Sequence, residues 1–143
     1  MQKRSSVFLD TSALLAGLNS PTGAAGVIIA ACYSGLILPI ISPQVIEEAE
    51  RNIVRKFPAL DDAWRAFLLT SPRITKKPSI AQVRAAYTLL PTSDAPILAS
   101  AITARPDALV TWNTKHFLQP NVVASVGFAI LTPGDFLARF LKL

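Results

Sequence analysis

Short apolar segments alternate along the chain with longer segments whose apolar residues recur at helical spacing. Residues 7–10, 36–41, 108–112 and 127–131 are short and apolar, which is typical of strands buried inside a sheet. Residues 72–76 predict a further, weaker strand. Strands that alternate with helices favour a mostly parallel sheet joined by right-handed crossovers. We therefore expect an α/β fold with helices on both faces of the sheet.

The segments between the strands show helical patterns. Residues 24–33 are apolar on nearly every side, so this helix should lie in the core or at a protein interface. Ser42 and Pro43 predict the N-cap and first position of a helix that runs to about Lys56. Further helices are predicted at residues 63–68, at 80–90, from a cap at Thr92 or Ser93 to about Ala104, and after Thr132.

The stretch from Thr11 to Ile46 contains no charged residue and is long enough to hold a membrane span of about 20 residues. Gly35, Pro39 and Pro43 interrupt it. A helix, a turn and a buried strand explain it better, so we expect no membrane insertion.

Length and composition predict one domain over residues 1–143, since 51% of the 143 residues are hydrophobic and can form one well-buried core. Cys32 is the only cysteine, which excludes an intramolecular disulfide and favours a reducing cytoplasm. Asp10 interrupts the basic and then apolar N-terminus, so we expect no secretion signal. The formal net charge of +5 favours an anionic partner.

Four polar residues at the ends of predicted elements should meet at one edge of the sheet. Asp10 and Asn113 follow strands, Asp94 begins a helix, and Glu48 lies in the second turn of another. Ligands bind such sheets at the carboxyl edge, where crossover helices also begin. With only nine acidic residues in the chain, gathering three there would be costly unless a cation offset their repulsion. Magnesium prefers oxygen ligands, and a two-ion site suits phosphodiester cleavage.

Three of these positions also have a simpler interpretation. Asp10 could serve only as the N-cap of the next helix, and the helix dipole favours a carboxylate at Asp94 whether or not it binds anything. Glu47, Glu48 and Glu50 could simply form a solvated face. On a helical wheel, Glu47 points away from the apolar side, whereas Glu48 and Glu50 flank it. Periodicity therefore leaves two candidate glutamates.

Asn113 could merely close a turn after its strand. His116 is the only histidine, and a turn or surface position is favoured over a general base because a metal-activated water needs no imidazole. The chain has no glycine-rich phosphate loop, zinc-type cysteine and histidine spacing, or serine nucleophile elbow.

Basic residues cluster in the second third of the chain and form the best candidate surface for RNA phosphates. A plain solvated face explains any one of them equally well. They are Arg51, Arg55 and Lys56 on one predicted helix, with Arg73, Lys76 and Lys77 just beyond it.

Four segments carry a resemblance that spans nearly the whole chain. They are VFLDTS at 7–12, SPQVIEE at 42–48, SDAPILASA at 93–101 and LVTWNTKHF at 109–117. Together these segments resemble the PIN-domain family, which includes VapC-like toxins and PilT N-terminus-type ribonucleases. The resemblance implies a three-layer sandwich with a mostly parallel sheet of about five strands. It also implies a homodimer and, for toxin members, a small antitoxin that blocks the metal site.

The same resemblance assigns roles to individual residues. It implies that one or two Mg2+ or Mn2+ ions are held by Asp10, Glu48, Asp94 and Asn113, with Thr11 and Thr111 orienting ligands or water. Many family members have Asp where this chain has Asn113, so the neutral side chain could weaken a second metal.

The leading hypothesis is a metal-dependent endoribonuclease, and two alternatives compete with it. The first is a PIN-like module that binds RNA or a protein without cutting, which Asn113 makes plausible. Tight metal binding would favour the nuclease. The second is a phosphatase with Asp10 as its nucleophile. Such enzymes usually carry another acid two residues later, where this chain has Ser12.

Overall fold

The computed structural model describes residues 4–142, in which the strands and helices follow the predicted alternation. Residues 1–3, the start of the basic N-terminus considered for a secretion signal, lie outside the described part, as does Leu143. The strands are β1 (Ser5–Leu9), β2 (Ile37–Ile41), β3 (Arg73–Ile74), β4 (Ala108–Val110) and β5 (Ala129–Leu131). The main helices are α1 (Thr11–Asn19), α2 (Ala24–Tyr33), α3 (Pro43–Arg55), α4 (Asp61–Leu68), α5 (Ile80–Leu89) and α6 (Ala95–Ala104). Shorter ones are η1 (Pro58–Leu60), α7 (Thr114–Phe117), α8 (Pro120–Ser125), α9 (Pro133–Phe136) and η2 (Leu137–Leu141).

All pairings in the described sheet are parallel, and the strand order is β3-β2-β1-β4-β5. The chain moves from the central β1 outward to β3 and then returns to place β4 on the other side of β1. Phe8 accordingly pairs with Ile40 on one side and Leu109 on the other. The strand order therefore reverses between β1 and β4, which is where open α/β sheets form their ligand sites.

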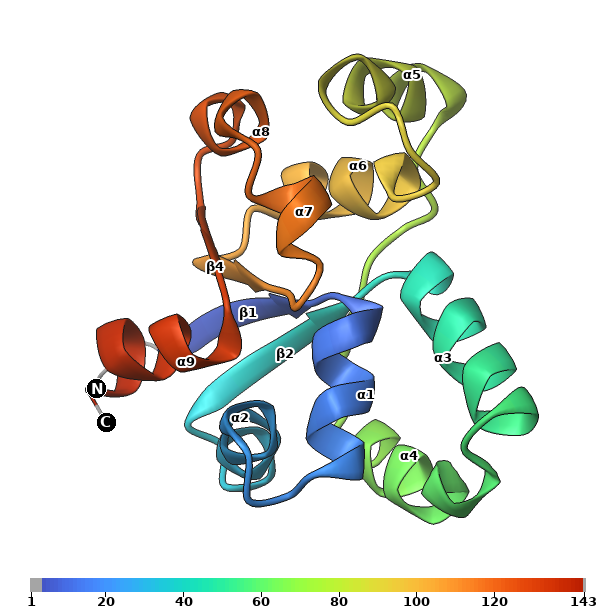
Figure 1. The fold of residues 1–143 in the computed structure, drawn as a ribbon, viewed down its shortest axis with the longest axis vertical. Coiled ribbons are helices and arrows are strands. Elements are labelled where there is room, and N and C mark those ends of the chain that lie inside the picture. The colour runs from blue at the N-terminus through green and yellow to red at the C-terminus, as the bar shows by residue number, and fades with distance from the viewer. Residues whose placement is uncertain (1–3, 143) are drawn as a thin grey trace.

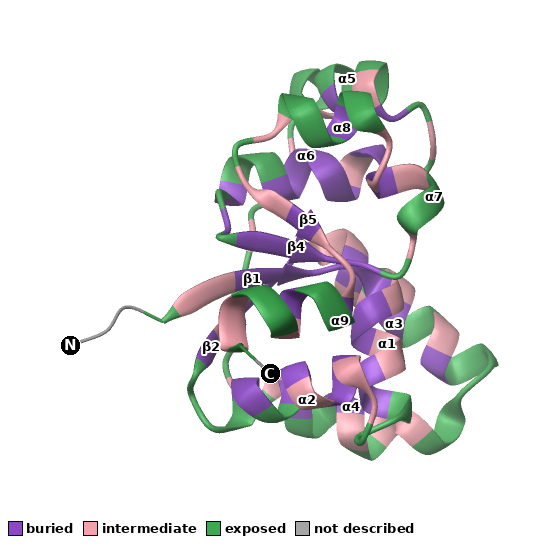
Figure 2. Cartoon of the chain, turned by 60° about the vertical axis from the view of Figure 1, so that its left-hand side comes forward, coloured by how far each residue is buried: buried purple, intermediate pink, exposed green. Residues whose placement is uncertain are grey.

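Helices cover both faces of the sheet, as Figures 1 and 2 show from two directions. One layer contains α1 to α4 and α9, and the other contains α5 to α8. The expected three-layer α/β fold with a parallel five-stranded sheet is confirmed.

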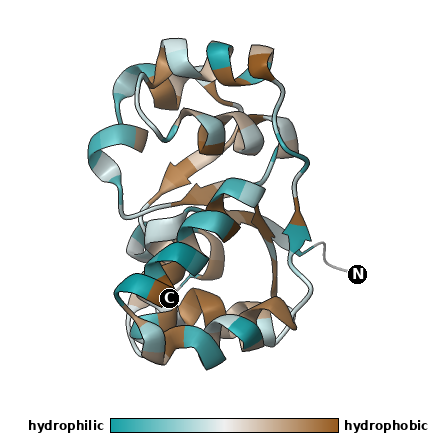
Figure 3. Cartoon of the chain, turned by 90° about the vertical axis from the view of Figure 1, so that its right-hand side faces the viewer, coloured by the Kyte–Doolittle hydropathy of each residue, from teal (hydrophilic) through white to brown (hydrophobic). Residues whose placement is uncertain are grey.

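The core lies where the strands meet these two layers. Val7, Phe8 and Leu9 of β1 are all at most 1% exposed, because both faces of the strand are covered. In Figure 3 the hydrophobic strands accordingly run through the middle of the molecule. The apolar helix α2 buries Ile28 and Ile29 in the same core, which is one of the two places expected for it.

Within residues 4–142 no single helix is both long and apolar enough to cross a membrane. Helices α1 and α2 meet that test only as a pair, by length and composition, and they are bent by 88° relative to each other.

Two of the differences between the structure and the predicted elements bear on the candidate residues. The N-cap of α6 is Asp94, not Thr92 or Ser93, because the Thr92 hydroxyl accepts a hydrogen bond from the Asp94 amide (3.1 Å) and closes the turn before the helix. Helices α7 and α8 were not predicted, since four and six residues are too few to show a helical period.

Candidate functional site

Asp10 lies at the carboxyl end of β1, beside the reversal of strand order, and is only 3% exposed. It occupies the N-cap position of α1, yet its side chain makes no capping hydrogen bond. Instead, its Oδ2 accepts hydrogen bonds from the hydroxyls of Thr111 (2.8 Å) and Ser12 (2.9 Å). A capping role therefore does not explain why this carboxyl is buried.

Asp94 reaches the same edge from the start of α6, and its side chain is 16% exposed. It too makes no capping hydrogen bond with its own helix. Its Oδ2 accepts a hydrogen bond from Asn113 Nδ2 (2.9 Å) and lies 2.8 Å from His116 Nδ1. The helix dipole alone would leave this side chain pointing into solvent, whereas here it faces the end of β4 and helix α7.

Glu48 is the glutamate of α3 that the structure brings to this group. It is partly buried, and its Oε2 accepts a hydrogen bond from the Thr11 hydroxyl (3.1 Å). Glu50 is exposed and instead accepts a hydrogen bond from Trp64 Nε1 (3.3 Å). Periodicity left Glu48 and Glu50 open, and tertiary packing separates them.

The three carboxyls repel one another. Burial raises the pKa of Asp10, hydrogen bonds from Thr111 and Ser12 lower it, and the charge of Asp94 raises it further. Burial also raises the pKa of Glu48, the hydrogen bond from Thr11 opposes this, and the charges of Asp10 and Asp94 add to the rise. A bound cation would relieve both the burial cost and the repulsion.

The burial and repulsion of these carboxyls predict that the stability of the metal-free protein depends on pH. The pKa values of Asp10 and Glu48 are higher in the folded chain, so the folded state binds more protons than the unfolded state above the ordinary carboxyl pKa of about 4. Ionisation of these two groups should therefore lower stability as the pH rises from about 4 toward neutrality.

Thermal unfolding in EDTA across this pH range tests that prediction. The difference between the wild type and an Asp10→Asn/Glu48→Gln variant isolates the two groups from the other charges of the chain. The variant should gain stability relative to the wild type as the pH rises. A constant difference would contradict the prediction.

Hydroxyl groups connect the ends of β1 and β4 beneath the carboxyls. Thr111 is fully buried, donates to Asp10 and accepts a hydrogen bond from the Asn113 amide (2.8 Å). Ser12 donates to Asp10 and accepts from the Trp112 amide (3.0 Å). Thr11 and Thr111 were named from the sequence, whereas the role of Ser12 was missed. Its position in the first turn after Asp10 was the available signal.

The sequence favoured a turn or surface position for His116, and the structure adds a specific partner to a partly exposed position. The residue lies in helix α7 with its side chain 33% exposed and its ring against Asp94. Asn113 and His116 are three residues apart, so a helix brings them to the same side. Helix α7 was too short to be predicted, so the sequence did not show that Asn113 and His116 lie on the same side.

The donor set fits a hard divalent cation. Carboxylate oxygens are the ligands that Mg2+ and Mn2+ prefer, and one or two of them suffice beside water and phosphate. Within residues 4–142 no three Asp, Glu, His or Cys side chains are gathered closely enough to hold an ion as they stand. Both hydrogen bonds to Asp94 fall on Oδ2, so Oδ1 takes part in neither. These two hydrogen bonds therefore leave one oxygen of Asp94 for an ion.

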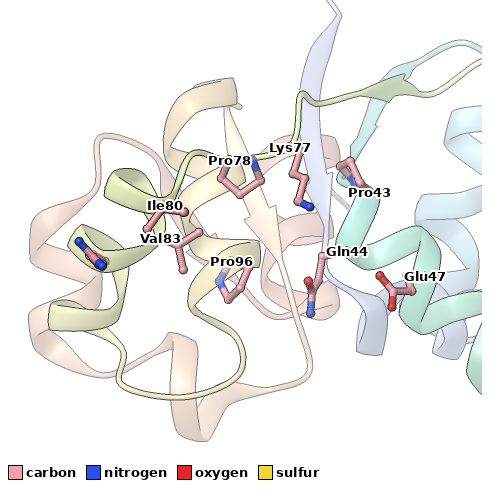
Figure 4. A pocket seen from close by; sticks show the side chains of 9 residues that line it. Pro43, Gln44, Glu47, Lys77, Pro78, Ile80, Val83 and Pro96 are labelled. Atoms are coloured by element: carbon pink, nitrogen blue, oxygen red, sulfur yellow. The ribbon is translucent and has the colours of Figure 1, made fainter.

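A groove of about 440 Å³ lies beside the carboxyls, between α3 on one side and α5 and α6 on the other (Figure 4). Gln44, which lines the groove, makes a side-chain hydrogen bond that lowers the pKa of Glu48, so the groove adjoins the site. Its walls are largely apolar, with two cationic side chains among them. The lining residues are Pro43, Gln44, Glu47, Lys77, Pro78, Ile80, Val83, Arg84 and Pro96.

Only one of the basic residues predicted to bind RNA lines the groove. Lys77 lines it, together with Arg84, which was not predicted. Lys76 and Arg73 are exposed but do not line it. On α3, Arg51 lies 3.8 Å from Glu47, while Arg55 and Lys56 stand at the far end of the helix, roughly 10 Å along its axis from Glu48. Arg84 was missed because only the folded chain places α5, which packs on α6, across the groove from the start of α3.

Comparison with known proteins places this arrangement in a family. Residues 6–115 match the family model described as PIN domain, and none of the curated proteins compared with the chain matches it in sequence. The crystal structure of PAE2754 from Pyrobaculum aerophilum superposes with a TM-score of 0.63 at 18% identity, over 99% of this chain and 100% of that one. VapBC2 from Rickettsia felis, bound to a DNA fragment from its promoter, gives 0.59 at 18% identity, over 88% and 98%.

At such low identity the two structures show a shared fold and nothing finer. The family match is stronger evidence, because it covers most of the chain and contains Asp10, Glu48, Asp94 and Asn113. This chain belongs to the PIN-domain family.

Proposed function

We propose that this protein is a metal-dependent endoribonuclease that uses Mg2+ or Mn2+ to hydrolyse RNA phosphodiester bonds. PIN domains are generally nucleases. The observation that carries the proposal is Asp10, a carboxyl only 3% exposed at the reversal of strand order, repelled by Asp94 and not used to cap its helix. Such an arrangement is costly to the fold, and a cation bound for catalysis accounts for it.

In this proposal, some residues bind the ion and others orient the residues that bind it. Asp10, Glu48 and Asp94 hold the ion, and Thr111, Ser12 and Thr11 orient two of these carboxyls by hydrogen bonds. Asn113 was expected as a fourth ligand, and in this conformation its Nδ2 donates to Asp94, so it acts on the ion through that residue. When bound, the ion would polarise the scissile phosphate and help to generate the attacking water.

The groove beside the site supports single-stranded RNA as the substrate. Lys77 and Arg84 offer cations to phosphates, and the prolines with Ile80 and Val83 offer an apolar surface to bases or riboses. An RNA strand lying in the groove would pass the carboxyls at its end.

Replacing Lys77 or Arg84 by alanine should therefore weaken RNA binding. Each change should also reduce the slope of log affinity against log salt by about 0.7, the value for one phosphate contact to a single strand. Fluorescence anisotropy of a labelled RNA in EDTA measures both effects without cleavage. Arg55→Ala is the matched control, since it removes the same charge as Arg84→Ala far from the groove. Equal losses for Arg55 and Arg84 would show that only net charge matters.

A toxin role extends the proposal. The shared fold with VapBC2 from Rickettsia felis supports a small antitoxin as partner, and the groove beside the carboxyls is a surface such a protein would block. We also propose a homodimer in the cytoplasm. Co-purification with the product of a neighbouring gene, and inhibition of cleavage by that product, tests the antitoxin.

The nuclease itself is tested with purified protein and an end-labelled single-stranded RNA in Mg2+, Mn2+ or EDTA. The proposal expects cleavage with either metal and none in EDTA. A binding module would instead shift the anisotropy of the RNA and leave it uncut with every metal. An Asp94→Asn preparation made in parallel controls for contaminating ribonucleases.

A further inference from the structure

Two nitrogen atoms from one short segment meet a single oxygen of Asp94. Asn113 Nδ2 lies 2.9 Å from Asp94 Oδ2, and His116 Nδ1 lies 2.8 Å from the same atom. Asn113 is the N-cap residue of α7, and His116 lies in that helix. The end of β4 and one turn of helix thus aim both side chains at the carboxyl.

The contact between His116 Nδ1 and Asp94 Oδ2 is a hydrogen bond only when Nδ1 carries a proton. An ionised carboxylate only accepts hydrogen bonds, so an unprotonated Nδ1 at 2.8 Å would set two lone pairs against each other. Asn113 Nδ2 is further from Nδ1, at 3.3 Å, and already donates to Asp94. The arrangement is therefore satisfied when His116 donates from Nδ1 to Asp94 Oδ2.

We propose that His116 is a positioning residue, which holds Asp94 through Oδ2 and leaves Oδ1 available to the divalent ion. This inference rests on the proposed metal-dependent function. Two donors on one oxygen restrict rotation of the carboxylate, and hydrogen bonds to a charged acceptor are stronger than neutral ones. Partners of this kind behind a metal ligand typically change metal affinity by about 10–100-fold.

The pair also suits a site that is already crowded with negative charge. Asn113 and His116 orient Asp94 without adding another carboxylate to the repulsion among Asp10, Glu48 and Asp94. A neutral side chain at position 113 is therefore compatible with metal binding.

Two amide variants distinguish this role from a role for the other ring nitrogen. Asparagine at position 116 keeps a nitrogen near the position of Nδ1, whereas glutamine extends its nitrogen toward that of Nε2. If His116 acts through Nδ1, His116→Asn retains its effect and His116→Gln does not. A direct ligand or a base acting through Nε2 would show the reverse order.

Isothermal titration of Mn2+ alone into the metal-free protein measures the effect without RNA. Compared with the wild type, His116→Gln and His116→Ala should bind Mn2+ about 10–100-fold more weakly, and His116→Asn should stay close to the wild type. Thr114→Ala, an exposed change on the same helix, is the control. Unfolding temperatures in EDTA establish that each variant is folded.

The outcomes distinguish a failure of the proposed function from a failure of the role proposed for His116. If the wild type binds no Mn2+, the proposed function fails and this inference fails with it. If the wild type binds Mn2+ and His116→Ala binds it equally well, or His116→Gln binds it better than His116→Asn, only the positioning role is overturned.

Discussion

Replacing Asp10 by asparagine should reduce RNA cleavage by on the order of 10²–10³-fold and at the same time raise the unfolding temperature of the metal-free protein. The two effects have one cause. Asparagine keeps an oxygen that can accept the hydrogen bonds from Thr111 and Ser12, so the shape of the site should persist. It removes a buried negative charge that binds the ion but lowers the stability of the metal-free protein.

Cleavage rates in Mn2+ and thermal unfolding in EDTA at pH 7 should be measured on the same preparations. Asp62→Asn, a change of the same kind at an exposed position on α4, should leave both quantities close to those of the wild type. If Asp10→Asn unfolded at a lower temperature than the wild type, the carboxyl would be a structural anchor and the account of its burial would be wrong.

Mn2+ should stabilise the wild-type protein strongly at neutral pH. A ligand that binds only the folded state adds about 2.7 kcal/mol at a concentration 100 times its dissociation constant. Part of the ion's affinity comes from offsetting the repulsion of Asp10 and Glu48 by Asp94. Asp10→Asn should lose most of this added stability, although it is the more stable protein without metal.

Denaturant unfolding at pH 7 with Mn2+ or with EDTA measures this stabilisation. Potassium chloride at matched ionic strength controls for screening of the chain's positive net charge. A shift of the same size in the wild type and in Asp10→Asn would place the stabilising ion elsewhere on the protein.

The fold, and the sheet edge at which the candidate residues gather, could be predicted because both depend on local patterns. Apolar runs at β1, β2 and β4 fix the sheet, and the carboxyl ends of parallel strands share one edge. Asp10 and Asp94 therefore come together whatever the details of the loops. The bounds of α2 and α3 also followed from the sequence, since composition and the Ser42-Pro43 cap mark them clearly.

The parts that could not be predicted depend on contacts between distant segments. The sequence could not tell whether Asp10 and Asp94 cap their helices, because the competing donors, Thr111 and Asn113, lie about 100 and 20 residues away. Trp64 draws Glu50 away from the site only once α4 packs beside α3. The alignment of His116 with Asn113 required a four-residue helix that leaves no period to detect.

Anomalous diffraction from crystals soaked in Mn2+ tests the central claim most directly, because it locates the ion without relying on activity. We expect an anomalous-difference peak for Mn2+ among the carboxylates of Asp10, Glu48 and Asp94, at the carboxyl end of β1. A peak elsewhere, or none at this position in a protein that cleaves RNA when Mn2+ is present, would contradict it.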